Sequence, residues 1–178
     1  MKKIKVLLML PILLGLIFSV NAQSDSKKKK IVDDSQAAKA EFIKTDKQMD
    51  GLFSKAYGYA IFPNVGKGGI GVGGASGNGA VWEQSNLIGS AKMTQVSVGL
   101  QFGGQAYREI VFFETKDAME RFKKNKIEFS AQVSAVAAAS GASANAKYVE
   151  GVMVFTMQKG GLMYEASVGG QKFKFTAD

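Results

Sequence analysis

The sequence contains no cysteine and no histidine among its 178 residues. Without cysteine the chain cannot form disulfides, use a thiolate nucleophile or carry a lipid on a lipoprotein-type cysteine. Without histidine it lacks the side chain best suited to proton transfer near neutral pH, and a metal site would depend on oxygen ligands alone. The acidic pairs Asp33–Asp34 and Glu109/Glu114 lack the spacing of a calcium loop. These absences argue against an enzyme and predict neither a metal nor a cofactor.

Arginine is also scarce, since Arg108 and Arg121 are the two in the chain. Lysine and arginine total 23 against 15 acidic residues. Three of the lysines lie in residues 1–22, so 20 basic residues against 15 acidic ones leave +5 from residue 23 onward. This mildly basic, lysine-dominated balance favours an anionic surface over nucleic acid as the partner.

The N-terminus has the pattern of an export signal. Three lysines precede an apolar run over residues 6–20, and small residues around Ala22 fit a cleavage site. The run is shorter than the roughly 20 apolar residues of a membrane-spanning helix. We therefore predict a signal peptide over residues 1–22 and a mature chain in the periplasm or cell envelope. Residues 23–34 are predicted to be a basic flexible tail, either solvated or attracted to anionic headgroups, and residues 35–178 to be a single domain.

Residues 35–56 have helical periodicity in two pieces. Phe42 shares one face with other apolar residues of the first piece, and Leu52 and Phe53 do so in the second. Between the pieces, residues 45–48 have the form of a capping box that begins with Thr45. Such apolar stripes are usually core, but an amphipathic helix beside lysines is also the pattern of a membrane-surface anchor. Both interpretations stay open at this point.

After Ala56 the periodicity changes from helical to alternating, which is typical of strands. A turn is predicted at residues 75–79, and a helix is predicted from the N-cap Thr115 to Lys124. Residues 128–146 alternate too, although their alanines would also suit a helix. The predicted fold is α+β: a mostly antiparallel, strongly curved or barrel-like sheet with N-terminal helices and one inserted helix. The predicted strands cover residues 59–62, 68–74, 80–82, 94–102, 105–114, 152–158, 162–168 and 171–175.

The glycine-rich stretch "IFPNVGKGGIGVGG", residues 61–74, matches G-x-G-x-x-G letter for letter. That fingerprint binds a dinucleotide only where a helix follows it, and here a turn and another strand are predicted. A Walker motif fails as well, because Gly68 follows Lys67. The glycines are predicted to leave one face of a strand bare, where another element or a ligand approaches the backbone. Lys67 is either a phosphate contact or a solvent-exposed lysine.

Three segments carry a family resemblance. "GYAIFPNVGKGGIGVGGASGNGAVW", residues 58–82, closely resembles the opening motif of the SYLF domain. "FFETKDAMERF" looks like the strand-to-helix step of that family, and "TMQKGGLMYEASVGG" is similar to its closing hairpin. The resemblance runs from about residue 39 to residue 175. It implies a module that binds anionic phospholipids, with actin binding in some members.

The resemblance also implies that an N-terminal amphipathic helix and basic residues contact the membrane. We therefore predict an exported module that associates with anionic phospholipid membranes. The alternative is a structural or protein-interaction domain of the cell envelope, which would bind a partner through its glycine-rich sheet face. A hydrolase built on carboxylates is the third hypothesis. The candidate lipid-binding residues are Lys44, Lys47, Lys55, Lys67, Phe42, Leu52 and Phe53.

Overall fold

The computed structural model describes residues 10–70, 72–98, 105–127, 129, 135–159 and 168–178. Its helices are α1 (Leu10–Thr45), α2 (Met49–Lys55), α3 (Lys116–Lys123) and the 3-10 helix η1 (Ala142–Asn145). Its strands are β1 (Gly58–Ile70), β2 (Val72–Glu83), β3 (Asn86–Val98), β4 (Gln105–Phe113), β5 (Ala135–Ala137), β6 (Val152–Gln158) and β7 (Gln171–Ala177). The α+β class is therefore as predicted. No helix in these ranges combines the length and the apolar composition needed to cross a membrane.

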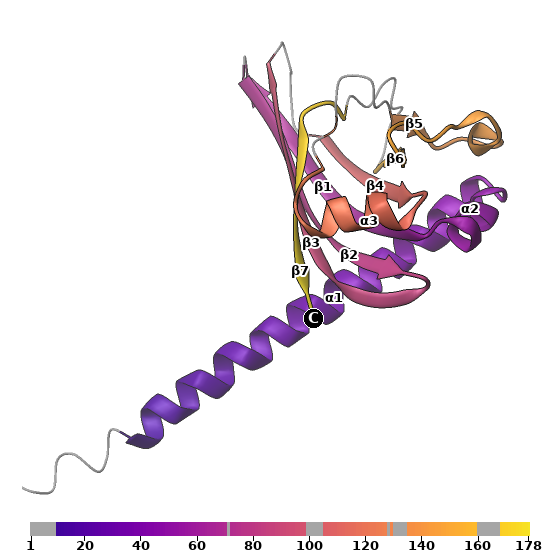
Figure 1. Cartoon of the computed structure of the whole chain (residues 1–178). Helices are drawn as coiled ribbons and strands as arrows, with labels where there is room; N and C mark the ends of the chain where they lie inside the picture. Colours follow the sequence, from indigo (N-terminus) through magenta and orange to yellow (C-terminus); the bar gives the residue numbers. More distant parts are fainter. Residues whose placement is uncertain (1–9, 71, 99–104, 128, 130–134, 160–167) are drawn as a thin grey trace, which may run out of the picture.

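The strands form one seven-stranded sheet in the order β5-β6-β4-β1-β2-β3-β7. All neighbours pair antiparallel except β5 and β6, which are parallel. Within the described ranges β5 and β7 have one neighbour each, so the sheet is open and the predicted barrel is wrong. The physical reason is that helices cover both faces (Figure 1), so neither face has to bury itself by closure.

Each face of the sheet has its own hydrophobic core. On one side, here called the α1 face, Phe42, Met49 and Phe53 pack against Tyr59 and Ile61 of β1. On the other, the α3 face, residues 118, 119 and 122 of α3 pack against residues 60, 62 and 65 of the same strand. Successive strand residues point to opposite faces, so burial on both sides requires continuous apolar runs. This explains the uninterrupted sequences at residues 59–62 and 110–113.

Strand β1 contains a bulge, and the glycines of β2 fit against it. The register of β1 shifts between Phe62 and Val65 relative to β4. A Cβ atom on Gly79 would clash with the Ile61 carbonyl oxygen, and one on Gly77 would lie 2.9 Å from the Asn64 carbonyl oxygen. The neighbouring strand therefore takes the space that these two glycines leave. The G-x-G-x-x-G match leads into strand β2 and not into a helix, as predicted.

Several predicted boundaries change. The turn predicted at residues 75–79 is wrong, because these residues lie inside β2, where 75–78 pair with β1 and 75–79 pair with β3. Strand β3 begins at Asn86, eight residues before the predicted start. Of the alternating segment at 128–146, the described part holds the short β5 and then η1. The predicted strand at 162–168 falls outside the described residues except for Val168. The helix at 115–124 is confirmed, with the Thr115 hydroxyl accepting from the Ala118 N–H at 3.3 Å.

The break between the two N-terminal helices lies where it was predicted, but a different contact stabilises it. Thr45 does not cap α2; its hydroxyl donates to the Glu41 carbonyl at 3.0 Å. Instead the buried Asp46 carboxylate accepts from the Gln48 N–H at 3.1 Å, and from the Ser143 N–H and hydroxyl at 2.9 and 2.7 Å. Burial alone would raise the pKa of Asp46, but these donors hold it below its ordinary value. Asp46 therefore fixes the helix break to η1.

Residues 23–34 are helical and lie within α1, in place of the predicted flexible tail. Contacts with the body of the protein explain this difference. The Lys28 ammonium lies 3.1 Å from the Asp178 carboxylate, and Ile31 and Val32 pack against the core of the α1 face. The signal peptide, its cleavage and the limits of the domain stay predictions.

Candidate functional site

The apolar members of the predicted lipid site belong to the core. Phe42 and Phe53 are 0% and 5% exposed, and Leu52 is half-buried against the same cluster. The Phe53 ring centroid lies 5.0 Å from that of Tyr59 and 4.9 Å from that of Phe112, both in edge arrangements. These side chains hold α1 and α2 on the sheet. The amphipathic pattern at residues 42–53 therefore describes packing against the α1 face.

The three helix lysines of the predicted site are exposed. Lys44 lies in the last turn of α1, Lys47 lies between the helices, and Lys55 ends α2. The ammonium groups of these three residues make no hydrogen bond or ion pair within the described part of the chain. This segment, residues 44–55, is here called the lysine corner. Its ammonium groups form no ion pair with a carboxylate of the described residues, although Asp46 and Asp50 lie in the same segment and leave it a net charge of +1.

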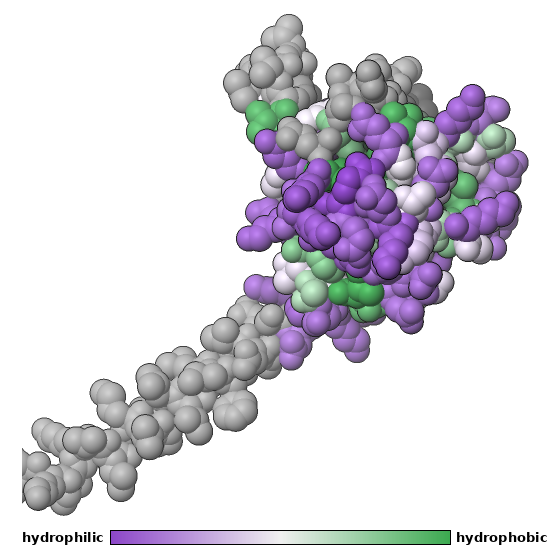
Figure 2. Space-filling model, in the orientation of Figure 1, coloured by the Kyte–Doolittle hydropathy of each residue, from purple (hydrophilic) through white to green (hydrophobic). Residues whose placement is uncertain are grey.

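The charges of α3 are arranged differently. Hydrophilic side chains gather over this helix on the face that Figure 2 shows. The Arg121 guanidinium lies 3.0 Å from Asp117, and the Lys123 ammonium lies 2.9 Å from Glu83 and also contacts Glu120. These pairs neutralise most of the basic charge of α3. The lysine corner is therefore the better candidate for an anionic surface.

Lys67 is separated from the lysine corner by the sheet. It is half-buried in β1, opposite Ala75 of β2 and Gln105 of β4. Ala75 belongs to the core of the α3 face, and paired residues point to the same side of a sheet. Lys67 thus projects on the α3 face, whereas Lys44, Lys47 and Lys55 belong to the helices on the α1 face. The structure does not unite the four predicted lysines in one surface.

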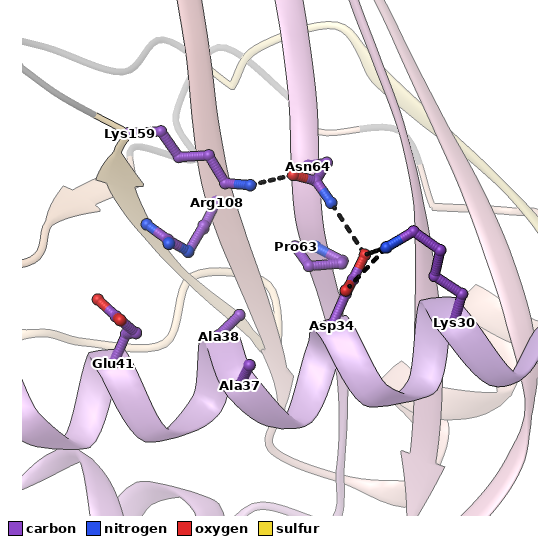
Figure 3. Close-up of a pocket in the computed structure, with 9 residues that line it drawn as sticks. All are labelled: Lys30, Asp34, Ala37, Ala38, Glu41, Pro63, Asn64, Arg108 and Lys159. Carbon is purple, nitrogen blue, oxygen red and sulfur yellow. Dashed lines mark hydrogen bonds and ion pairs between the residues drawn. The ribbon is translucent and has the colours of Figure 1, made fainter.

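A cavity of about 320 Å³ lies between α1 and the sheet (Figure 3). The bulge of β1 brings Asn64 to its edge, β4 supplies Arg108, and the residue after β6 is Lys159. The Lys159 N–H donates to the Ala106 carbonyl at 2.9 Å, which fixes this residue beside β4. The small side chains of α1 leave the space open. The lining residues are Lys30, Asp34, Ala37, Ala38, Glu41, Pro63, Asn64, Arg108 and Lys159.

A chain of polar contacts crosses this cavity. The Lys30 ammonium lies 3.1 Å from the Asp34 carboxylate, and the Asn64 amide donates to the same carboxylate at 3.4 Å. The Lys159 ammonium donates to the Asn64 side-chain oxygen. Burial lowers the pKa of Lys159, and the positive charge of Arg108 lowers it further, while Asp34 opposes the shift. The Arg108 guanidinium makes no hydrogen bond or ion pair with any residue that the structure describes.

The sequence did not reveal this cavity, because its residues come from α1, β1, β4 and the end of β6. One signal was available. The chain has only two arginines, and the other, Arg121, is engaged with Asp117 and with the Glu150 carbonyl. An arginine outside such a network is an informative residue, since its guanidinium recognises carboxylates and phosphates in pairs of hydrogen bonds.

A second polar group is buried on the α3 face. Glu109 is 0% exposed, and its carboxylate accepts from the Gln171 amide at 2.9 Å. Burial raises the pKa of Glu109 to about 7, although the hydrogen bond from Gln171 opposes the shift. Burial, and then the charge of Glu109, raises the pKa of the neighbouring Tyr107. The described residues hold no cluster of three or more metal-ligating side chains around this carboxyl or elsewhere.

Comparison with known proteins identifies the family. Residues 94–178 match the Ysc84 family model, described as "Las17-binding protein actin regulator". The chain thus belongs to the Ysc84, or SYLF, family, as its motifs predicted, and this is a family of binding domains. The chain is also similar to Beta cell expansion factor A of Aeromonas veronii, at 30% identity over 128 residues. That match covers 71% of this chain and 49% of the relative, so the chain spans about half the length of the relative.

Proposed function

We propose that this protein binds anionic phospholipid surfaces through the lysine corner. The observation that carries the proposal is the exposure of Lys44, Lys47 and Lys55 without short-range partners in the described structure. Membership of the SYLF family supports it, because the sequence resemblance implies a lipid-binding module. We further propose that the protein is exported and meets this surface in the cell envelope.

The structure changes the mechanism expected for such binding. Since Phe42 and Phe53 hold the helices on the sheet, their insertion into a bilayer would expose the core of the α1 face. Binding is therefore peripheral and electrostatic. A basic residue near an anionic membrane contributes about 1 kcal/mol, so three lysines contribute about 3 kcal/mol, or roughly a hundredfold in affinity. The exposed Lys27 and Lys29 of α1 add to this attraction.

Vesicle co-sedimentation of the chain from Gln23 tests the proposal. We expect binding to vesicles that contain phosphatidylglycerol, weak binding to neutral vesicles, and release at high salt. The triple variant Lys44→Gln/Lys47→Gln/Lys55→Gln should lose most of the affinity. Lys67→Gln is the matched control, because it removes one lysine from the opposite face. Equal binding to neutral and anionic vesicles would contradict the electrostatic mechanism.

A protein partner is the second candidate, and the family description favours it by naming an actin regulator. The glycines Gly77 and Gly79 do not form such a surface, since they pack against β1. The exposed apolar side chains Val96 and Leu87 of β3, at 73% and 42%, are better contacts. Under this candidate, Val96→Ser/Leu87→Ser should reduce capture of an envelope protein and leave vesicle binding unchanged.

A further inference from the structure

We propose that the cavity between α1 and the sheet is a binding site for a phosphate monoester group. This site is separate from the lysine corner and does not depend on membrane binding. Its donors come from three elements: Arg108 from β4, Lys159 from the end of β6, and the Asn64 amide from the bulge of β1. Figure 3 shows these side chains around one opening above α1.

Two cations of the cavity lie outside its ion pair and can contact an anion. Lys30 and Asp34 form an ion pair at 3.1 Å and neutralise each other. This leaves the Arg108 guanidinium and the Lys159 ammonium against the Glu41 carboxylate, a net charge of +1, and Lys159 reaches an amide oxygen rather than a carboxylate. A phosphate monoester carries a charge of about −1.5 to −2 at pH 7 and three acceptor oxygens, so it can accept from both cations at once. A carboxylate or a phosphodiester brings a single negative charge.

The two cations of the cavity repel each other. Burial lowers the pKa of Lys159 and the positive charge of Arg108 lowers it further, as expected for two cations that line one cavity. A bound phosphate would relieve this repulsion by placing negative charge beside both groups. The guanidinium supplies the paired N–H groups that suit phosphate oxygens, and the ammonium supplies a point charge.

Glu41 is the internal competitor for this site. It lines the cavity from α1, and Figure 3 shows its side chain on the same side of the opening as Arg108. Its carboxylate repels an incoming anion and partly offsets the two cations. Removal of this charge should therefore strengthen phosphate binding, whereas removal of Arg108 should weaken it. If the cavity bound no anion, Glu41→Gln and Arg108→Gln would not change phosphate binding in opposite directions.

The dimensions fit a small group. A volume of about 320 Å³ is at the lower end for small-molecule sites, which run from roughly 300 to 1,000 Å³. Ala37 and Ala38 on α1 have short side chains, so the helix closes one side without filling the space. A phosphate with a short substituent would fit, either as a soluble metabolite or as the headgroup of a lipid whose tails remain outside.

Isothermal titration and vesicle binding together test the proposal and distinguish these two sources. In the first arm, glycerol 3-phosphate is titrated into the chain from Gln23. In the second, the chain is bound to vesicles with phosphatidic acid, a monoester, or with phosphatidylglycerol, a diester, at matched surface charge. The variants are Arg108→Gln, Lys159→Gln and Glu41→Gln, and Lys174→Gln removes an exposed lysine of β7 as the control. Thermal unfolding verifies that each variant is folded.

We expect Arg108→Gln to weaken monoester binding about ten- to a hundredfold, as for the loss of a charge-assisted hydrogen bond. Glu41→Gln should tighten it about two- to fivefold, and Lys174→Gln should leave it unchanged. If glycerol 3-phosphate binds and the three variants change its affinity in this way, the ligand is a soluble phosphate monoester. A preference for phosphatidic acid that Arg108→Gln removes, without a soluble response, assigns a lipid headgroup. If neither arm depends on Arg108, the proposal is wrong, whatever the lysine corner does on phosphatidylglycerol.

Discussion

Replacement of Glu109 by glutamine should stabilise the protein above neutral pH. The Glu109 carboxyl is fully buried on the α3 face, where burial raises its pKa from 4.5 to about 7. In the unfolded chain the carboxyl ionises near 4.5. Between these two pKa values the folded protein therefore keeps a proton that the unfolded chain loses, and stability decreases as the pH rises.

The size of the effect follows from the shift. A difference of about 2.5 pKa units corresponds to about 3 kcal/mol, at 1.36 kcal/mol per unit. The stabilising contribution of the protonated carboxyl is complete below pH 4.5 and is lost as the pH rises through about 7. Glutamine has the same shape and does not titrate, and its oxygen still accepts from the Gln171 amide. Glu109→Gln should match the parent near pH 4.5 and exceed it by about 3 kcal/mol at pH 8.5.

Urea unfolding monitored by the fluorescence of Trp82 measures this difference. Trp82 is the single tryptophan of the chain, is 4% exposed and stacks on Tyr59, so it reports global unfolding. At pH 8.5 the gain corresponds to an increase of roughly 6–12 °C in melting temperature. Glu114→Gln removes an exposed carboxylate of the next loop and should not reproduce the gain. A constant difference between Glu109→Gln and the parent across pH 4.5–8.5 would refute the reasoning.

Four substitutions test the fold further, each by urea unfolding. Asp46→Asn should lower the free energy of unfolding by about 1–3 kcal/mol at pH 7, because it weakens the charge-assisted hydrogen bonds from Ser143. Since folding lowers the pKa of Asp46, this difference between variant and parent should disappear as the pH falls below about 3.8. Gly79→Ala should lower the free energy of unfolding by about 1–3 kcal/mol, because the new Cβ would clash with the backbone of β1. Gly66→Ala should leave it almost unchanged, because a Cβ at that position would have no atom within 4 Å. Gly51→Ala should stabilise α2 by about 0.5–1 kcal/mol, because it too has open space.

The sequence predicted features that depend on neighbouring residues. Periodicity located the helices on either side of residue 46 and the helix after Thr115, and apolar runs located β1, β4 and β6. Features that depend on distant contacts were wrong or missing. The sequence places Asp46 in a capping box with its neighbours. Its actual partner, Ser143, lies 97 residues away in the chain, so the local pattern could not show this contact. The barrel was predicted because periodicity does not show that a second helical layer covers the other face of the sheet.

The same distinction between local patterns and distant contacts applies to the residues of the candidate site. The helix lysines could be proposed from sequence, since lysines beside an apolar stripe are a local pattern, and their role in lipid binding stays a prediction. It left open whether Phe42 and Phe53 face a membrane or the core, and only the three-dimensional packing decides this in favour of the core. Lys67 was grouped with the helix lysines, although the sheet separates them. Arg108 and Lys159 were missed, because 50 residues lie between them and each depends on the pairing of β4 with β6 for its position.

One irregularity in β1 connects the fold to the cavity. An unbroken strand through residues 62–65 would keep Asn64 in regular alternation beside β2. The bulge moves it to the edge of α1, where it contacts both Asp34 and Lys159. The same helix is fixed nearby by the Ser35 hydroxyl, which donates to the Ile61 carbonyl at 3.2 Å. The packing that seats α1 on the sheet therefore also brings Asn64 and Arg108 into one cavity lining. Changes at Asn64 should thus alter the binding of glycerol 3-phosphate in this cavity more than changes in the lysine corner do.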